Sequence, residues 1–221
     1  DTYFKMIPFA EKLAKEYGAE HDPLLITEAH NFNGVQWGKD KRYLRNNFTP
    51  ASQIASLFWD YYEFTGDEEF LKERAYTFMK KASHFYLDRL EWDEEKNEYF
   101  LKASLYESAP IAYVKNPISD RNCIERLFKD CIRAAEILNV DKDEVKQWRH
   151  VLNHLWERGY QQFGECGEVI SPAEEYYTEK RYSPWIWGNG GAVAFPAGLI
   201  GIDDKDTRLG KAVVNLLKHD D

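Results

Sequence analysis

Two acidic segments place carboxylates among aromatic and apolar residues, where they could do chemistry. The first is Ser-Leu-Tyr-Glu-Ser-Ala-Pro at residues 104–110, with Glu107 at its centre. Partial burial among such neighbours would raise the pKa of Glu107 and keep a proton on it, which suits a general acid. A solvated loop glutamate with no chemical role is the alternative interpretation, and it stays open because most charged loop residues are simply exposed.

The second acidic segment carries two adjacent carboxylates. Glu174 and Glu175 stand before two tyrosines, in a stretch without helical periodicity. With Glu107 they form the predicted catalytic set, in which they would supply a base or bind hydroxyl groups of a ligand. A solvated acidic loop would have the same composition, so this alternative also stays open.

Two further segments combine aromatic and polar residues in the way expected of a ligand platform. Residues 30–42 read His-Asn-Phe-Asn-Gly-Val-Gln-Trp-Gly-Lys-Asp-Lys-Arg, and residues 181–191 hold two tryptophans beside a Gly-rich turn. Aromatic rings offer an apolar face and, in Tyr and Trp, a polar handle, which suits sugar binding; packing of a tryptophan in the core is the plainer alternative. The predicted substrate contacts are Asn31, Asn33, Trp37, Asp40, Arg42, Arg181, Trp185, Trp187 and Asn189.

The composition argues against a nucleic-acid-binding or membrane-spanning protein. The 221 residues carry a net charge of −9 without a long basic run, whereas nucleic-acid binding depends on clustered Lys and Arg. No apolar run approaches the roughly 20 residues of a membrane span. Aromatic residues make up 15%, which fits either a large aromatic core or sugar binding.

The sequence predicts neither a metal nor a cofactor. Its three cysteines, Cys123, Cys131 and Cys166, lack zinc spacing. His150 and His154 lie four residues apart, but the segment lacks the glutamate of a zinc-protease helix and a third ligand nearby. The sequence also holds no Walker loop, dinucleotide fingerprint or nucleophile elbow.

Helical periodicity predicts the elements that position these segments. The predicted helices cover residues 2–18, 49–65, 67–90, 119–138, 142–155 and about 206–218. Thr49 is the predicted N-cap of the second helix, with Pro50 at its first position, and Asp67 is the predicted cap of the third. Residues 93–97 predict a hairpin turn, and a short strand follows it.

These helices form a repeat. Helix, Thr-Gly-Asp turn and helix are followed, after a long irregular stretch, by helix, Asn-Val-Asp turn and helix. An α-hairpin cannot bury its apolar face alone, so the two hairpins should stack. Because residues 30–42 and 104–110 each precede the first helix of a hairpin, both segments should lie at the same end of the stack.

The first hairpin carries a family resemblance. Residues 58–82 read Phe-Trp-Asp-Tyr-Tyr-Glu-Phe-Thr-Gly-Asp-Glu-Glu-Phe-Leu-Lys-Glu-Arg-Ala-Tyr-Thr-Phe-Met-Lys-Lys-Ala. This segment resembles the catalytic domain of glycoside hydrolase family 95 and its relatives in the six-hairpin glycosidase superfamily. The likeness continues at residues 104–107, 120–141, 174–175 and 181–183. It implies an all-α fold, in which residues 1–221 form a single segment of an (α/α)6 toroid with minor β-structure in the loops.

The resemblance also implies an activity. Glu107 would be the general acid of an inverting α-glycosidase of the kind best known for α-L-fucosides, while a second carboxylate activates water from the other face. Asn31 and Asn33 resemble the family's water-positioning pair and are assigned here as substrate contacts only. The chain predicts fewer helices than six hairpins need, which implies an incomplete barrel with the rest of a longer parent chain as its partner. Family habit implies a glycan substrate and an extracellular or periplasmic location.

Two other classes of protein stay open. A non-catalytic carbohydrate-binding or scaffold module on the same fold would keep the aromatic loops without the reaction. An interaction repeat of the α-solenoid kind would have short polar loops, which the long aromatic loops disfavour. A second carboxylate about 6.5–9.5 Å from Glu107 would distinguish an inverting enzyme from a binding module.

Overall fold

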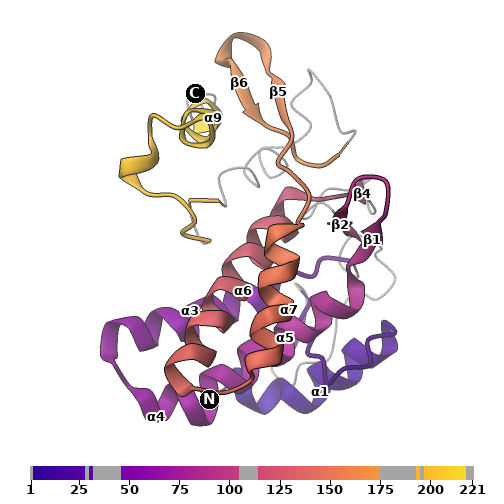
Figure 1. Cartoon of the computed structure of the whole chain (residues 1–221), viewed down its shortest axis with the longest axis vertical. Helices are drawn as coiled ribbons and strands as arrows, with labels where there is room; N and C mark the ends of the chain where they lie inside the picture. The colour runs from indigo at the N-terminus through magenta and orange to yellow at the C-terminus, as the bar shows by residue number, and fades with distance from the viewer. Residues whose placement is uncertain are drawn as a thin grey trace.

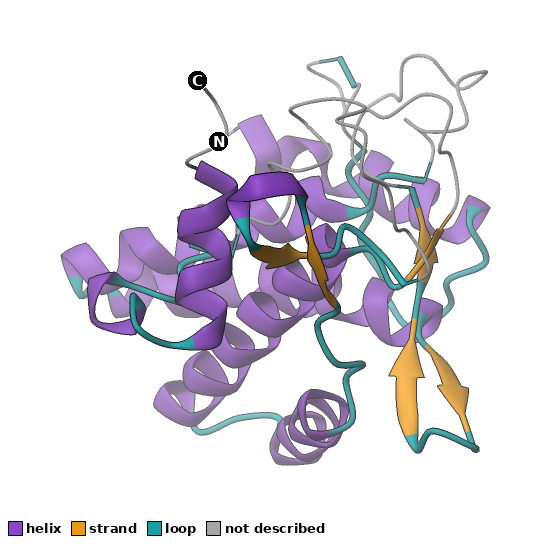
Figure 2. Cartoon of the chain, turned by 90° about the horizontal axis from the view of Figure 1, so that it is seen from above, coloured by secondary structure: helices purple, strands orange, loops and turns teal. Residues whose placement is uncertain are grey.

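The computed structural model describes residues 2–27, 30–31, 46–104, 114–174, 193–194 and 197–217. Helices make up most of these residues, and the strands are short (Figure 2). The α-helices are α1 (Thr2–Glu16), α3 (Thr49–Thr65), α4 (Glu68–Phe70), α5 (Tyr76–Arg89), α6 (Ile118–Leu138), α7 (Lys142–Asn153) and α9 (Arg208–Leu217). The strands are β1 (Glu91–Asp93), β2 (Glu98–Phe100), β3 (Lys102–Ala103), β4 (Val114–Lys115), β5 (Tyr160–Gln162) and β6 (Glu168–Ile170).

The first predicted α-hairpin is confirmed, with two local differences. Helix α3 ends at Gly66 in the left-handed conformation (φ 67°), and the Asp67 carboxylate caps the next helix by accepting the Phe70 N–H at 2.9 Å. A π-helical stretch η1 (Leu71–Ala75) joins α4 to α5, where an unbroken helix was expected. Thr49 is not the N-cap of α3: Phe48 takes that position, and the Thr49 hydroxyl donates to Asn47 Oδ1 instead.

The second predicted α-hairpin, α6 followed by α7, is confirmed as well. The turn between them, residues 139–141, has two left-handed residues, Asn139 (φ 52°) and Asp141 (φ 50°). Asn tolerates this conformation because its short polar side chain can hydrogen-bond locally. Figure 1 shows the two hairpins packed together, and α6 contacts both α3 and α5.

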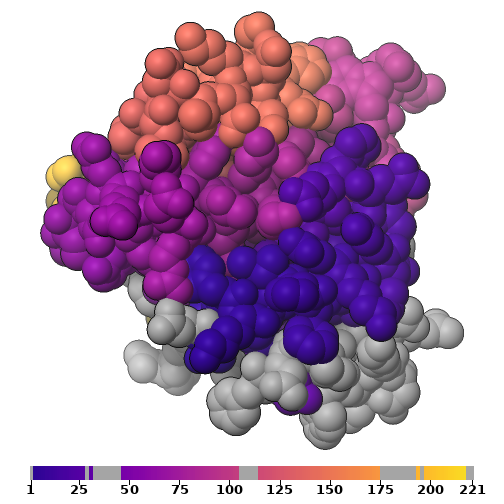
Figure 3. All heavy atoms as spheres, turned by 90° about the horizontal axis from the view of Figure 1, so that it is seen from below, coloured from indigo at the N-terminus to yellow at the C-terminus, as the bar shows by residue number. Residues whose placement is uncertain are grey.

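One large apolar core lies between these helices. One apolar face of η1 and α5 follows the helical period and is buried throughout, at Leu71, Ala75, Phe78, Ala82 and Phe85. Helix α1 and the segment at Leu24 and Leu25 cover another side of the core: the Leu24 N–H donates to the Lys81 carbonyl of α5, and the Leu25 N–H donates to the Ala10 carbonyl of α1. Figure 3 shows this N-terminal region beside the α3–α5 hairpin.

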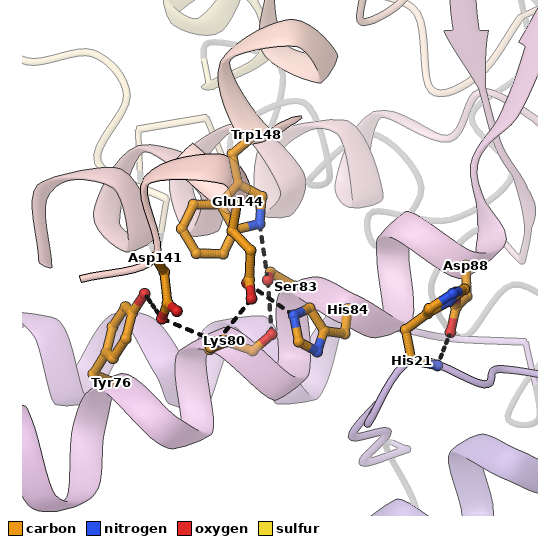
Figure 4. A network of polar contacts seen from close by, with 9 residues as sticks. All are labelled: His21, Tyr76, Lys80, Ser83, His84, Asp88, Asp141, Glu144 and Trp148. Atoms are coloured by element: carbon orange, nitrogen blue, oxygen red, sulfur yellow. Dashed lines mark hydrogen bonds and ion pairs between the residues drawn. The ribbon is translucent and has the colours of Figure 1, made fainter. Parts of the chain in front are cut away.

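Polar contacts connect α5 to α7 across the hairpin interface (Figure 4). The Asp141 carboxylate accepts hydrogen bonds from the Tyr76 hydroxyl at 2.7 Å and from Lys80 at 2.9 Å. Glu144 pairs with Lys80 at 2.7 Å and with His84 Nε2 at 2.9 Å. Because these partners lie on two different hairpins, the contacts fix how one hairpin lies against the other.

A smaller apolar cluster joins the end of the chain to the start of α6. Helix α9 packs on β6, and their buried residues meet those of α6 and the segment around Val193. This unit lies at one end of the helical bundle, as Figure 1 shows. Its buried members are Ile118, Ile170, Val193, Ala212 and Val213.

The three cysteines are free thiols; Cys131 is buried, and Cys123 and Cys166 are partly exposed. None of the helices in the described ranges combines the length and apolar character that a membrane crossing needs.

Candidate functional site

The segments that carry the predicted site residues have flanks that meet at one end of the molecule. The Ser104 N–H donates to the Asn46 carbonyl at 3.0 Å, which joins the residues just before 105–113 to those just after 32–45. Strands β3 and β4 pair Ala103 with Val114 and so bring together both flanks of 105–113. The Glu174 N–H then donates to the Lys115 carbonyl at 3.0 Å. The sequence predicts that residues 30–42 and 104–110 lie at the same end of the stack. The described flanks of these two segments confirm this prediction.

Glu174 is the predicted catalytic carboxylate that the structure describes. One of its oxygens accepts a hydrogen bond from Lys96 Nζ at 2.7 Å, and the other accepts one from Asn116 Nδ2 at 2.6 Å. The Lys115 ammonium lies 3.4 Å from the second oxygen. Partial burial would raise the pKa of Glu174, but the hydrogen bond from Lys96 and the charges of Lys115 and Lys96 lower it overall. The carboxylate is ionised and held in place by protein donors.

Asn116 positions Glu174 against the β3–β4 pair. Its amide oxygen accepts the Leu101 N–H at 3.0 Å while its amide nitrogen donates to Glu174. The backbone of Asn116 is left-handed (φ 59°), which lets the chain turn from β4 into Pro117 and α6. Buried Asn116 thus links three segments of the chain.

Glu98, on β2, lies beside Glu174 with a different charge environment. Burial raises the pKa of Glu98, and the Glu174 and Asp93 carboxylates add to this rise, against the opposing charges of Lys96 and Lys115. Lys96 lies 3.8 Å from Glu98 and 2.7 Å from Glu174. One ammonium group therefore lies between two carboxyl groups whose pKa values shift in opposite directions.

These groups line a cavity of about 310 Å³. Its walls come from the β1–β2 turn, the start of α6, the segment after α7 and the segment after β6, which meet beside β4 in Figure 1. The lining is mostly polar and includes charged side chains of both signs. Its residues include Lys96, Glu98, Asn116, Ile118, Trp156, Glu157, Arg158, Ser171, Ala173 and Glu174.

A larger groove of about 810 Å³ runs along α6 and α7 but holds charges that are already paired. Arg126 donates to Asp60 at 2.6 Å and to Asp130 at 2.5 Å. Glu125 accepts from Arg121 and Arg158, each at 2.6 Å. Because its cations and carboxylates satisfy one another, this groove has less to offer a ligand than the smaller cavity.

Most of the predicted site residues lie outside the described part of the chain. These are Glu107, Glu175, Asn33, Trp37, Asp40, Arg42, Arg181, Trp185, Trp187 and Asn189. Asn31 is described and exposed, next to His30, whose ring Nδ1 donates to the Thr27 carbonyl at 2.7 Å. The roles of all these residues stay predictions.

The sequence patterns did not identify Asn116, Lys96 and Glu98 as site residues. The dipeptide Asn116-Pro117 before a helix is a turn signal that could have drawn attention to Asn116. Lys96 and Glu98 carried no such signal, because a hairpin turn with charged residues is usually only a solvated surface. Lys96 and Glu98 lie close to Glu174 only through contacts between segments that are more than 70 positions apart along the chain.

The two histidines of α7 form an aromatic cluster with β1 and β2. The rings of His150 and His154 lie 4.4 Å apart, and Trp92 stacks on His150 with 6.1 Å between ring centroids. His154 Nδ1 donates to the His150 carbonyl at 2.8 Å. Within the described ranges, no group of three or more His, Cys, Asp or Glu side chains is arranged to hold a metal ion.

Comparisons with known proteins find similarities in sequence and in fold. The chain is 22% identical, over 177 residues, to a protein-glucosylgalactosylhydroxylysine glucosidase of Dictyostelium discoideum; the match covers 70% of this chain and 24% of that protein. Its fold matches a solved structure of a human-microbiome protein named as a kojibiose phosphorylase, with a TM-score of 0.60 and 11% identity over 78% of this chain and 26% of the other. The chain thus spans about a quarter of the length of these relatives.

The family model of the glycosyl hydrolase family 95 catalytic domain matches residues 5–219, nearly the whole chain. Both the all-α fold and the resemblance of the first hairpin are thereby confirmed. The chain belongs to the glycosyl hydrolase family 95 catalytic-domain family.

Proposed function

We propose that this chain provides the general acid and part of the substrate site of an inverting glycoside hydrolase. The observation that carries the proposal is the set of backbone hydrogen bonds that join the flanks of the three predicted site segments. They bring Asn46 to Ser104 and Lys115 to Glu174 at 3.0 Å each. Segments anchored in this way can act on one ligand.

Glu107 is the proposed general acid, which protonates the leaving glycosidic oxygen. A second carboxylate would activate water on the opposite face of the sugar ring, as inverting chemistry requires. Glu174 suits a supporting role better than that of the base, because its oxygens already accept hydrogen bonds from Lys96 and Asn116. An ionised carboxylate held in this way can position neighbouring loops and ligand hydroxyls. Glu175 is the proposed partner of Glu174 at the substrate.

An α-L-fucoside is the first substrate class to test, because the first hairpin resembles enzymes of that kind. A glucoside is the second, since one relative is named as a glucosidase. The aromatic segments carrying Trp37, Trp185 and Trp187 would supply ring faces for either sugar. We further propose that the protein acts on glycans outside the cytoplasm, and fractionation of the source cells tests this location.

The test compares wild type with Glu107→Gln in the natural full-length chain that contains these residues. Glutamine keeps the shape of the side chain and removes its acidic proton, so turnover of the preferred oligosaccharide should fall at least ~100-fold. A p-nitrophenyl glycoside should lose less, because its phenolate leaves without protonation. The panel contains p-nitrophenyl and oligosaccharide α-L-fucosides, α-glucosides and α-galactosides. Glu95→Gln is the matched control, because Glu95 is an exposed glutamate of the β1–β2 turn.

The outcomes separate the two classes of function. Turnover that collapses in Glu107→Gln and persists in Glu95→Gln supports the hydrolase and its acid. Equal turnover in both variants removes Glu107 from the mechanism. Saturable sugar binding by a wild type that turns over no glycoside would replace the enzyme by a carbohydrate-binding module.

A further inference from the structure

The cavity beside Glu174 contains buried polar groups that lack a partner among the described residues. The Ser171 hydroxyl is buried, with 3% of the residue exposed, and makes no hydrogen bond there. Arg158 donates from Nη2 to Glu125 at 2.6 Å and to Asn122 at 3.3 Å, but its buried Nε is unused. Buried donors without a partner cost stability, so such groups in a cavity wall indicate a place for a polar ligand.

Gly159 keeps the space beside Ser171 open. A Cβ atom added to Gly159 would lie 3.2 Å from Ser171 Cβ and 3.3 Å from Ser171 Oγ, closer than ordinary van der Waals contact. The backbones of these two residues are already joined, since the Ser171 N–H donates to the Gly159 carbonyl at 2.9 Å. A side chain at position 159 would therefore crowd the serine hydroxyl, which is buried in the cavity wall.

The lining combines one apolar wall with several hydrogen-bonding groups. Trp156 and Ile118, which are 3% and 1% exposed, form the buried apolar backing of the wall, and Glu98 and Ser171 contribute its oxygen atoms. Three carboxylates meet three cations, which leaves no net charge to attract an anionic ligand: Glu98, Glu157 and Glu174 against Lys96, Arg158 and the adjacent Lys115. A volume of about 310 Å³ is at the small end of the roughly 300–1,000 Å³ usual for ligand sites.

We propose that this cavity is a subsite for one neutral sugar ring of the glycan substrate. The ring would lie against the wall that Trp156 backs, its hydroxyls would donate to Glu98, and small side-chain movements would bring Ser171 Oγ and Arg158 Nε within hydrogen-bond distance. The proposal rests on the proposed function, since it takes a glycan as the ligand. It adds a binding position to the loops that carry Trp37 and Glu107.

The experiment measures binding separately from turnover. The full-length chain carrying Glu107→Gln is titrated with methyl α-L-fucoside, methyl α-D-glucoside and methyl α-D-galactoside, by calorimetry and saturation-transfer NMR. Ser171→Ala and Glu98→Gln are then added one at a time. Each removes one hydrogen-bonding group, so each should weaken binding of the preferred sugar about tenfold, since every 1.4 kcal/mol is tenfold in affinity. Glu165→Gln, an exposed glutamate outside the cavity, is the matched control.

Gly159→Ala provides a second, steric test of the same cavity. The added methyl group crowds Ser171 without removing a polar group, so it should weaken sugar binding at least as much as Ser171→Ala does. Thermal unfolding of each variant checks that the fold is kept. D-Glucuronate is a further probe, and its carboxylate should bind more weakly than the neutral sugars.

Each result bears on the proposal. A tenfold loss in the cavity variants, with no change in Glu165→Gln, supports the subsite. Unchanged affinity in Ser171→Ala, Glu98→Gln and Gly159→Ala overturns it, even if the wild type hydrolyses glycosides, because the sugar then binds elsewhere. Absence of saturable sugar binding, up to the solubility of the methyl glycosides, also overturns the subsite. Failure of the hydrolase proposal is read separately, from the turnover of Glu107→Gln against wild type.

Discussion

The α5–α7 interface and the cavity beside Glu174 differ in how far their polar groups are paired. At the interface the Trp148 indole N–H donates to the Ser83 hydroxyl at 3.1 Å, and Lys80 satisfies both Asp141 and Glu144. In the cavity the Ser171 hydroxyl and Arg158 Nε have no partner among the described residues. The interface is not perfectly paired either, because His84 Nδ1 also lacks a described partner.

Paired polar groups indicate a structural interface, and unpaired polar groups in a cavity indicate a binding site. Polar groups that find one another across a helix interface fix the relative position of two hairpins and leave little for a ligand. Groups that stay unpaired in a cavity keep their hydrogen-bonding capacity for something that enters. We therefore expect substitutions at the interface to change the stability of the fold, and substitutions at the cavity end to change mainly local geometry and binding.

The largest effect on stability is expected from Trp148→Ala at the interface. The indole of Trp148 is fully buried, so its removal should lower the free energy of unfolding by about 3–5 kcal/mol. Chemical denaturation measures the change. Phe64→Ala is the control, because Phe64 on α3 is 93% exposed and its removal should change stability little. Equal losses in the two variants would contradict the assignment of Trp148 to the core.

A smaller, pH-dependent effect is expected from Asp120→Asn at the start of α6. Burial raises the pKa of Asp120 from 3.8 to about 7, while hydrogen bonds from Tyr86 and Ser119 oppose the rise. The folded state therefore binds a proton more tightly than the unfolded state, and this stability is lost as the pH rises from about 4 to about 7. Asparagine mimics the protonated acid, so the variant should be more stable at pH 8 by up to about 4 kcal/mol, at about 1.4 kcal/mol for each pKa unit.

The pH profile of unfolding tests this prediction. Asp120→Asn and wild type should converge near pH 4 and separate above pH 7. Asp143→Asn is the control: Asp143 is exposed, and a hydrogen bond and the charge of Lys146 lower its pKa, so the substitution should give no gain at pH 8. A constant difference between Asp120→Asn and wild type at every pH would show that Asp120 does not titrate as proposed.

At the cavity end, Asn116→Ala tests the link between β3 and Glu174. The substitution removes hydrogen bonds to Leu101 and Glu174 and strains a left-handed backbone. Asn97→Ala is the matched control, because Asn97 is exposed on the β1–β2 turn with nearly the same backbone angle (φ 53° against 59°). The excess loss for Asn116→Ala should be about 2 kcal/mol, or about 1 kcal/mol for each hydrogen bond. A thermal melt giving equal losses would reduce the role of Asn116 to backbone conformation.

The smallest effect on stability is expected from Lys96→Gln. Lys96 is 48% exposed, and exposed ion pairs contribute about 0–1 kcal/mol. The substitution should nevertheless raise the pKa of Glu174, because it removes a hydrogen bond and a charge that lower this pKa. Stability from Glu174 is present above its unfolded pKa and is lost as the pH falls through the folded value, so the loss should begin at higher pH in the variant.

Carbon-detected NMR titration of the Glu174 carboxyl group measures this shift. Lys102→Gln is the control: Lys102 is 43% exposed and lies 3.8 Å from Glu91, so the pKa of Glu174 should stay as in wild type. If both variants shift the pKa of Glu174 alike, the effect comes from net charge and not from the Lys96 hydrogen bond.

Local sequence signals predicted the helices and their turns because the physics that sets them is local. Gly66 ends α3 in a left-handed conformation that glycine adopts without steric cost, and Asn139 does the same for α6. The apolar period of α5 coincides with its buried face. On α3 the same period places Leu57 and Tyr61 on the apolar face, yet they are 61% and 47% exposed, because periodicity indicates which residues share a face and not which neighbours cover that face.

Two aspartates at equivalent positions show that local sequence patterns do not predict tertiary contacts. Asp67 and Asp141 occupy the last position of the two repeated turns, and the sequence treats them alike. Asp67 caps its own helix, whereas the Asp141 carboxylate accepts hydrogen bonds from Tyr76 and Lys80 on the other hairpin. Only packing of the hairpins decides which partner an aspartate meets.

The sequence by itself determined the all-α class, the two hairpins and the segments that should hold the site, since these depend on residue type and period over short distances. Tertiary structure alone decided that Lys96, Glu98, Asn116 and Ser171 meet Glu174 around one cavity. These residues come from the β1–β2 hairpin, the start of α6 and the segment after β6, and only the packing of the chain brings these segments together. For that reason the unpartnered polar groups of the cavity have no signature in the sequence.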